Sequence, residues 1–302
     1  MSKEITVVKP SVEIITEENP ALKLEMCMRV CYKSEGKICE GSADKIIKKI
    51  IERGHTSTLE HVHLRLKGYR TSVGDCQHSV LSHYIGISNN EYVGNVRAWL
   101  NYLVSAENSP SELDFTCDVE CALKNLYPEL FKKVDNTISP YFFEIEPVMT
   151  VRFVCDRGVS HELVRHRVAS FSQESTRYCD YSGAIKFIKP CFKWAKPIIE
   201  GTYSVKDLMV VNMGLTPQAY PWLMAMDYAN KCYNHMIKEG CSPQEARAVL
   251  PNSLKTELIM TATYDQWVEI FKLRLNPAAH PQAQEVMLLL KQSPDLPEEL
   301  KK

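Results

Sequence analysis

The sequence lacks the features that would place it in a membrane or on a nucleic acid. No stretch approaches the roughly 18 consecutive apolar residues that a spanning helix needs, although 45% of the 302 residues are hydrophobic. Neither charge sign dominates, because 36 Lys and Arg face 37 Asp and Glu and leave a net charge of −1. A nucleic-acid binder normally carries a clear excess of positive charge. The composition therefore predicts a soluble protein with no nucleic acid and no membrane among its partners.

Disulfide and dinucleotide patterns are missing as well. The 11 cysteines are odd in number and show no framework spacing, and residues 1–4 contain no apolar signal region. Both observations predict a reducing, cytoplasmic location. Glycine is scarce, and no Gly-x-Gly-x-x-Gly fingerprint occurs anywhere. A glycine-rich dinucleotide turn is therefore excluded. Among the cysteines, Cys191 is interpreted as structural.

What the sequence does contain is a series of strand and helix signals. Alternating or β-branched runs predict strands at 5–8, 12–15, 61–66 and 148–155. Capping and periodicity predict helices at 20–30, 92–103, 109–134, 216–240, 242–251 and 265–275, and a last helix that ends at 290. A further helix is predicted from an N-cap at Ser42 to a stop at Gly54. Trp99 is predicted to face inward, and residues 298–302 form a charged tail. Residues 72–146 are interpreted as an inserted helical elaboration rather than a second domain.

Histidines are concentrated between residues 55 and 63. Polar and apolar residues alternate from His61 onward, which predicts that His61, His63 and Arg65 share one face of a strand. With His55 and Glu60 nearby, this set fits a metal site. It fits equally a polar strand face that lines a ligand cleft, and the residues alone leave both interpretations open.

A second concentration of polar residues begins with Arg165-His166-Arg167. On a helix, Arg165 and Arg167 would point to nearly opposite sides, which suits a pocket shared between two surfaces. The segment that follows offers hydroxyls, an amide and Arg177 within a few residues, as the binding of a phosphate and a polar base requires. The alternative is a solvated basic helix end followed by an ordinary loop.

These residues closely resemble a family signature. Arg165-His166-Arg167, seven residues, Ser175 and Arg177-Tyr178 resemble the motif of the flavin-dependent thymidylate synthases, the ThyX family. The resemblance extends to Gly54-His55 with Leu59-Glu60-His61, to Glu245-Ala246-Arg247 with Leu250-Pro251, and to Leu273-Arg274 with Ala279-His280-Pro281-Gln282. Only 72–146 and 190–215 have no counterpart.

The resemblance implies a fold, an assembly and a reaction. It implies a single ThyX-like catalytic domain over 1–302, with an α/β fold of the α+β type in which a mixed, largely antiparallel sheet packs with helices. It also implies a cytoplasmic homotetramer with active sites at subunit interfaces. The implied reaction is the reductive methylation of dUMP to dTMP, with FAD as cofactor, methylenetetrahydrofolate as carbon donor and NADPH as reductant, and no metal.

The resemblance also implies residue roles. The flavin would be held by Ser57, Glu60, Arg165, His166 and Arg167, and the nucleotide by Ser175, Thr176, Arg177, Arg247 and Arg274. The residues implied in catalysis are Arg274, Ser175 and His55. Hydride transfer from a flavin requires no cysteine nucleophile, and none stands out in the sequence.

The chain departs from the family pattern at several positions. The usual Asn-Glu pair is Ser172-Gln173, with Glu174 one place later, and the Gln expected three residues before Arg165 is Glu162. A reciprocal exchange is the interpretation, so Glu162, Gln173 and Glu174 are all candidates to contact the nucleotide. Thr263 and Glu269 stand where Asn is frequent, which leaves open how the adenine end of FAD is held.

Two other classes of function compete with this reading. One is a non-catalytic RNA- or nucleotide-binding module that keeps the phosphate-binding residues without turnover. The other is a metal-dependent nucleotide hydrolase that uses His55, Glu60, His61 and His63.

Overall fold

The computed structural model describes residues 4–66, 85–88, 91–106, 123, 143–145, 147–183, 185–204 and 214–301. The strands are β1 Glu4–Val8, β2 Ser11–Ile14, β3 His63–Leu66, β4 Ile85–Ser88, β5 Glu91–Asn95, β6 Phe143–Ile145, β7 Val148–Asp156, β8 Ser170–Gln173, β9 Lys186–Ile188, β10 Gly201–Ser204 and β11 Lys255–Thr263. The α-helices are α1 Pro20–Val30, α2 Ser42–Glu52, α3 Val96–Ala106, α5 Arg157–Leu163, α7 Ala219–Lys238, α8 Pro243–Ala246, α9 Tyr264–Arg274, α10 Pro281–Lys291 and α11 Glu298–Lys301. The 3-10 turns are η1 Glu35–Lys37, η2 Thr56–His61, η4 Lys193–Ala195 and η5 Arg247–Val249.

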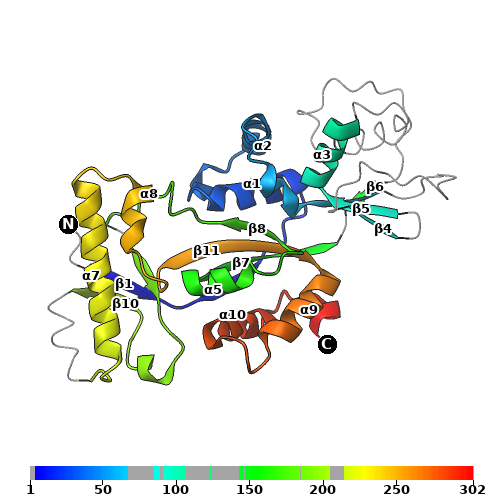
Figure 1. Ribbon diagram of the computed structural model, residues 1–302. Coiled ribbons are helices and arrows are strands. Elements are labelled where there is room, and N and C mark those ends of the chain that lie inside the picture. The colour runs from blue at the N-terminus through cyan, green and yellow to red at the C-terminus, as the bar shows by residue number, and fades with distance from the viewer. Residues whose placement is uncertain are drawn as a thin grey trace.

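A four-stranded antiparallel sheet in the order β2-β7-β11-β8 forms the centre of the molecule (Figure 1). Its two longest strands, β7 and β11, pair along their whole length, from Lys255 opposite Asp156 to Thr263 opposite Val148. The remaining pairs of this sheet are antiparallel too. The predicted α+β class with a largely antiparallel sheet is therefore confirmed.

Helices cover both faces of this sheet. Helices α5, α9 and α10 lie on one face and α1 with α2 on the other (Figure 1). Strand β11 alternates accordingly, since Leu258 and Met260 pack with α5, α9 and α10 while Ile259 packs with Cys27 and Val30 of α1. Strand β11 is therefore buried on both sides and pairs on both edges, with β7 and with β8.

Two smaller sheets flank the central one. Strand β1 pairs in parallel with β9 and antiparallel with β10, and helix α7 packs beside them. Strands β4, β5, β3 and β6 form an antiparallel sheet that packs with α1, α2 and α3. The described part of the predicted helical elaboration at 72–146 thus contains strands as well as helix α3.

The helix predicted over 92–103 was placed too early in the chain. Tyr92–Asn95 belongs to β5, which pairs with β3 and β4, and the helix begins only at Val96. Trp99 is fully buried, as predicted, and its Nε1 donates a 3.0 Å hydrogen bond to the Gly94 carbonyl. Apart from Leu123, which is buried, the helix predicted over 109–134 lies outside the described residues.

Helix α2 shows one correct and one wrong prediction. Its N-cap is Gly41, at a φ of 71°, and not Ser42, whose hydroxyl instead contacts the buried carboxylate of Glu25. Its C-terminus is a Schellman motif, in which Gly54 at a φ of 70° donates to the Ile51 carbonyl and His55 N–H donates to the Ile50 carbonyl. The predicted stop at Gly54 is confirmed, and it fixes where His55 leaves the helix.

Other boundaries differ by a few residues. Helix α7 begins at Ala219 rather than at Thr216, and the predicted tail at 298–302 contains helix α11, whose Leu300 is buried. Helix α5 ends at Leu163, two residues before the basic motif. None of the helices in the described ranges is both long and apolar enough to cross a membrane.

Candidate functional site

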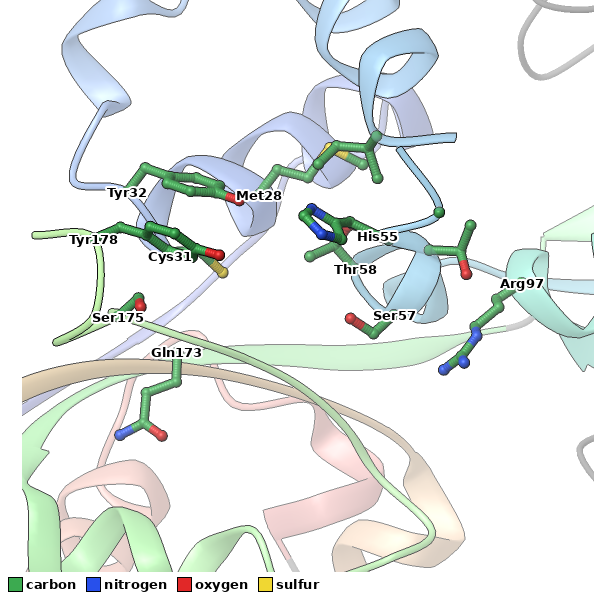
Figure 2. A pocket seen from close by; sticks show the side chains of 13 residues that line it. Met28, Cys31, Tyr32, His55, Ser57, Thr58, Arg97, Gln173, Ser175 and Tyr178 are labelled. Carbon is green, nitrogen blue, oxygen red and sulfur yellow. The ribbon is translucent and has the colours of Figure 1, made fainter. Parts of the chain in front are cut away.

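A cavity of about 380 Å³ opens between the end of α1, η2, the residues after β8, and α3 (Figure 2). It brings together His55 and Ser57, from the segment that begins at Gly54, with Gln173 and Ser175, from the segment that follows the basic motif. Its lining residues are Met28, Cys31, Tyr32, Ile50, Gly54, His55, Thr56, Ser57, Thr58, Arg97, Gln173, Ser175 and Tyr178.

Two tyrosines form one side of this cavity. The ring centroids of Tyr32 and Tyr178 lie 5.4 Å apart at an interplanar angle of 36°, and the residues are 40% and 52% exposed. Met28 and Ile50 add apolar surface. The sequence motif contains Tyr178 but gives no signal for Tyr32, which reaches the cavity only because α1 packs on the sheet beside β8.

His61 fixes the η2 wall to the central sheet. Its Nδ1 and Nε2 lie 2.7 Å from Thr261 Oγ1 and 2.8 Å from Ser172 Oγ, and the side chain is fully buried. Burial lowers the pKa of His61 to about 3, so the ring is neutral at pH 7. The predicted strand over 61–66 was therefore wrong at its start, because His61 ends η2 and strand β3 begins at His63.

The burial of His61 also bears on the metal interpretation. Both ring nitrogens of His61 face hydroxyls of the sheet, which leaves neither for the set proposed with His55, Glu60 and His63. Across the described ranges, no group of three or more His, Cys, Asp or Glu side chains is placed to hold a metal ion.

Glu60 lies at the same wall and is paired. Arg97 Nη1 is 2.5 Å from Glu60 Oε1, and Ser170 Oγ donates a 3.0 Å hydrogen bond to the Glu60 carbonyl. Arg97 itself lines the cavity, a role that nothing in the sequence predicted. The Arg97 guanidinium at this cavity is therefore oriented by Glu60, which is one of the predicted flavin-binding residues.

The basic motif is not helical, contrary to the prediction. Because α5 ends at Leu163, residues 165–167 lie in turns that lead into β8, and Arg165 and Arg167 are exposed. His166 differs from both, since its Nε2 accepts a 2.8 Å hydrogen bond from Arg274 Nε. Burial, followed by the charge of Arg274, lowers the pKa of His166 to about 4. The motif therefore presents two cations and one neutral imidazole at pH 7.

Arg274 is held by a second partner, Glu162. Its Nη1 donates a 2.7 Å hydrogen bond to Glu162 Oε2, and its Nη2 donates to the Glu162 carbonyl. The hydrogen bond from Arg274 lowers the pKa of Glu162. Glu162 therefore orients a cation, but that cation is Arg274 rather than His166, which lies beyond the end of α5.

Gln173 does not join Glu162 in this chain. Its Nε2 donates to Ser160 Oγ at 2.8 Å and to Thr256 Oγ1 at 3.2 Å. Figure 2 shows its amide directed away from the tyrosine pair. The predicted reciprocal exchange placed both side chains on one nucleotide, whereas here each has its own protein partners.

Glu174 and Thr176 are buried. Glu174 lies 2.5 Å from Lys33 Nζ and 3.1 Å from Lys255 Nζ, and it accepts a 3.1 Å hydrogen bond from the Glu257 N–H. Both residues are less than 10% exposed. The structure thus places these two predicted nucleotide contacts inside the protein, where Glu174 forms ion pairs with two lysines.

Arg177 contacts helix α8, and Arg247 follows that helix directly in the chain. Both are exposed, and Arg177 Nε donates a 3.3 Å hydrogen bond to Gln244 Oε1 of α8, three residues before Arg247. The predicted capping box of α8 is present, with Ser242 N–H donating to Glu245 Oε2 at 2.8 Å. Neither arginine is among the described residues that line the cavity.

Comparison with known proteins supplies a family. The model of the family described as "Thymidylate synthase complementing protein" matches residues 13–95 and 143–293. Flavin-dependent thymidylate synthases from Pyrococcus abyssi and Sulfolobus acidocaldarius are 27% and 33% identical over 132 and 137 residues, which are 44% and 45% of this chain. These stretches are 48% and 42% of the relatives, so the chain spans less than half the length of the curated relatives it matches.

Solved structures give a weaker likeness. The UMP/dUMP methylase PolB from Streptomyces cacaoi, bound with 5-Br UMP, is 16% identical with a TM-score of 0.40 over 95% of this chain and 89% of that one. The same protein bound with 5-Br dUMP is 18% identical with the same TM-score. The family match covers well over half of the sequence, including η2, the basic motif and Arg274, and the chain therefore belongs to the thymidylate synthase complementing protein family.

Proposed function

We propose that this chain is a flavin-dependent thymidylate synthase that converts dUMP to dTMP. FAD is the cofactor, methylenetetrahydrofolate the carbon donor and NADPH the reductant. Family membership supports this proposal, and so does the cavity in which His55 and Ser57 meet Ser175 from a distant segment. The convergence of these three predicted site residues is the observation that carries the proposal.

The lining of the cavity fits a flat ring with polar edges. Tyr32, Tyr178 and Met28 offer apolar and aromatic surface, while His55 and Ser175 offer hydrogen-bonding groups. Flavin, pterin and uracil rings all have this character. A flavin bound here would supply the hydride that the reductive methylation of the uracil ring requires.

Arg274 is the residue we assign to the pyrimidine edge. A guanidinium carries five N–H donors, and Arg274 uses three of them on His166 and Glu162. The guanidinium stays charged, and its two remaining N–H groups are fixed in direction. Both properties suit the polarisation of a ring carbonyl during attack at C6. Glu162 and His166 position Arg274 for this role.

Arg177 and Arg247 are assigned to the nucleotide phosphate. Both are exposed, and Arg177 donates to Gln244 of α8, three residues before Arg247. Arginine binds phosphate bidentately and remains charged at every physiological pH. In this assignment Ser175 stands between the phosphate and the ring.

We assign the protein to a cytoplasmic homotetramer with active sites at subunit interfaces. Arg165 and Arg167 are exposed, and so are two apolar residues that neighbour site arginines in the sequence, namely Val168 at 63%, next to Arg167, and Leu273 at 61%, next to Arg274 on α9. Apolar side chains among cations on a surface are typical of an interface. Arg165 and Arg167 would then hold a flavin together with the Ser57 and Glu60 wall of a neighbouring copy.

Tritium release from 5-labelled dUMP tests the function directly. We expect release that depends on FAD, NADPH and methylenetetrahydrofolate, and a yellow protein whose absorbance NADPH bleaches. A colourless protein that retains nucleic acid would instead support the binding-module alternative. Activity that requires an added metal, without flavin, would support the hydrolase alternative.

A further inference from the structure

A second cavity lies on the other side of Tyr32 and His55. It has a volume of about 520 Å³ and is formed by α1, η1 and α2. We call it the basic groove, and its lining residues are Arg29, Tyr32, Ser34, Lys37, Ser42, Lys45, Ile46, Lys49, Ile50, Arg53 and His55. Tyr32, Ile50 and His55 line the first cavity as well, so the two cavities are adjacent and share these residues as a wall.

Four of the lining residues are exposed cations. Lys45, Lys49 and Arg53 follow one another at four-residue intervals along one side of α2, and Lys37 stands on η1. Within the described part of the chain, no ion pair includes any of these four, and no carboxylate lines the basic groove. Arg29 is different, because it is buried and pairs with Glu25 at 2.5 Å.

Concentrated positive charge of this kind has a cost. Like charges one helical turn apart repel each other and destabilise the helix that carries them. A protein with a net charge of −1 has carboxylates enough to neutralise them. Their absence from the basic groove indicates a surface arranged for a ligand with several negative charges.

The distribution of the charge indicates the shape of that ligand. Lys45 and Arg53 are eight residues apart, which on an α-helix corresponds to about 12 Å. Single charges spaced along this length suit an extended tail with repeated carboxylates. A compact phosphate is more commonly bound by convergent groups, such as a guanidinium fork or several backbone N–H groups.

We propose that the basic groove binds the poly-γ-glutamyl tail of the folate co-substrate, whose ring lies in the first cavity beside Tyr32 and His55. This inference rests on the proposed function, because a folate is bound only if the protein uses one. The phosphates of NADPH are the other source of a multiply charged tail, and the experiment separates the two.

The test is equilibrium binding rather than turnover. Affinity is measured by titration calorimetry for tetrahydrofolate with one glutamyl residue and with five, at low and at high salt. We expect the longer ligand to bind about tenfold more tightly at low salt, with the difference shrinking as salt screens exposed charges. Equal affinities at low salt, or no binding of either ligand, would overturn the proposal.

Substitutions then locate the effect. Lys45→Gln with Lys49→Gln should remove most of the preference for the longer ligand, while the short ligand binds within about twofold of the parent value. Lys48→Gln is the matched control, since Lys48 is exposed on the same helix and does not line the basic groove. An equal loss of preference in the control variant would also overturn the proposal.

The NADPH arm uses the same variants. If the double variant binds NADPH several-fold more weakly, binds NADH unchanged and keeps its preference for the longer folate, the basic groove serves the phosphate and the proposal fails. Failure of the proposed function is separate, because a protein that prefers the pentaglutamate but releases no tritium from labelled dUMP contradicts the synthase assignment alone.

Discussion

At the scale of single residues, Arg274 depends on two partners of different character. Glu162 is a carboxylate 2.7 Å away, and His166 is a neutral imidazole that accepts at 2.8 Å. The imidazole accepts through Nε2, which requires its proton to reside on Nδ1. Arg274 is thereby fixed by one charged and one uncharged acceptor, and each can be removed separately.

Glu162→Gln is expected to weaken this arrangement without unfolding it. Loss of a charge-assisted bond corresponds to about 1–2 kcal/mol, so kcat/KM for dUMP should fall roughly 5- to 30-fold. Flavin content and melting temperature should change little, because the Glu162 side chain is 36% exposed. Steady-state kinetics on the flavin-loaded enzyme measure the effect, and an unchanged kcat/KM would contradict the positioning role.

Adding Gln173→Glu should not restore the lost activity. The sequence motif places Glu162 and Gln173 on one nucleotide, but Gln173 donates to Ser160 and Thr256 instead. We therefore expect two independent losses, which a double-mutant cycle reveals as additivity. Recovery in the double variant would revive the exchange interpretation.

The sequence motif indicated which residues gather at one cavity, but not which side chains would find partners in distant segments. His55, Ser57 and Ser175 reach one cavity, as the resemblance implies. Glu174 does not, because lysines from positions 33 and 255 enclose it. The order of polar and apolar residues around Glu174 could not reveal this burial, because a loop that faces solvent can have the same order.

At the scale of elements, Asp156 joins three segments. It is the N-cap of α5, where its Oδ1 accepts from the Val159 N–H at 2.8 Å, and its Oδ2 accepts from Gln282 of α10 at 2.7 Å. Gly158 leaves room for this carboxylate, because a Cβ there would stand 2.9 Å from Oδ1. Asp156 therefore sets where α5 begins, and with it the position of Glu162.

Asp156→Ala is expected to lower the free energy of unfolding by about 2 kcal/mol, the sum of a lost cap and a half-buried Gln282 amide left without its acceptor. Urea denaturation measures the change. Asp156→Asn keeps an acceptor for the Val159 N–H and should lose markedly less. Equal stability of the parent and the Ala variant would show that water replaces both bonds.

Local chemistry decided which elements were predictable. The stop at Gly54 and the capping box at 242–245 depend on neighbours within a few residues, and both are present. The segment 92–95 was misassigned because its partners in β3 and β4 determine its conformation. The helical preference of such a short segment is weaker than the stabilisation from hydrogen bonding to strands on both of its edges.

At the scale of the whole molecule, two neutral histidines make stability depend on pH. The pKa values of His61 and His166 are lowered from 6.5 to about 3 and about 4, in both cases first by burial. Between those values and 6.5 the unfolded chain binds protons that the folded chain does not. Their contribution is therefore fully present above pH 6.5 and is lost as the pH falls toward 4 and below.

Urea unfolding at pH 7, 6, 5 and 4.5 measures this dependence. Each group contributes at most about 1.4 kcal/mol per pH unit within the window. His61→Asn should flatten the profile, because an amide between Thr261 and Ser172 does not titrate. A parent profile that is level from pH 7 to 5 would contradict the assignment of neutral buried rings.

Subunit mixing tests whether one active site needs two chains. In its own chain, Arg247 is not among the described residues that line the cavity of His55. If sites form between copies, His55→Ala and Arg247→Ala should each be inactive, while a refolded equal mixture should recover about a quarter of the parent activity. Mixtures that stay inactive would place the complete site within one chain.

The C-terminus of α2 contributes residues to both cavities, so a movement of this helix would affect both. The N–H groups of Gly54 and His55 bond to carbonyls of the same helix whose cations line the basic groove, so the wall of the first cavity is an extension of α2. Suppose an anion in the basic groove holds α2 still and thereby raises ring affinity. Thermodynamic reciprocity then requires the ring to raise anion affinity by the same factor. A short polyglutamate without any ring would then promote the binding of a monoglutamyl folate, which leaves the basic groove free, and would compete with the tail of a pentaglutamyl folate.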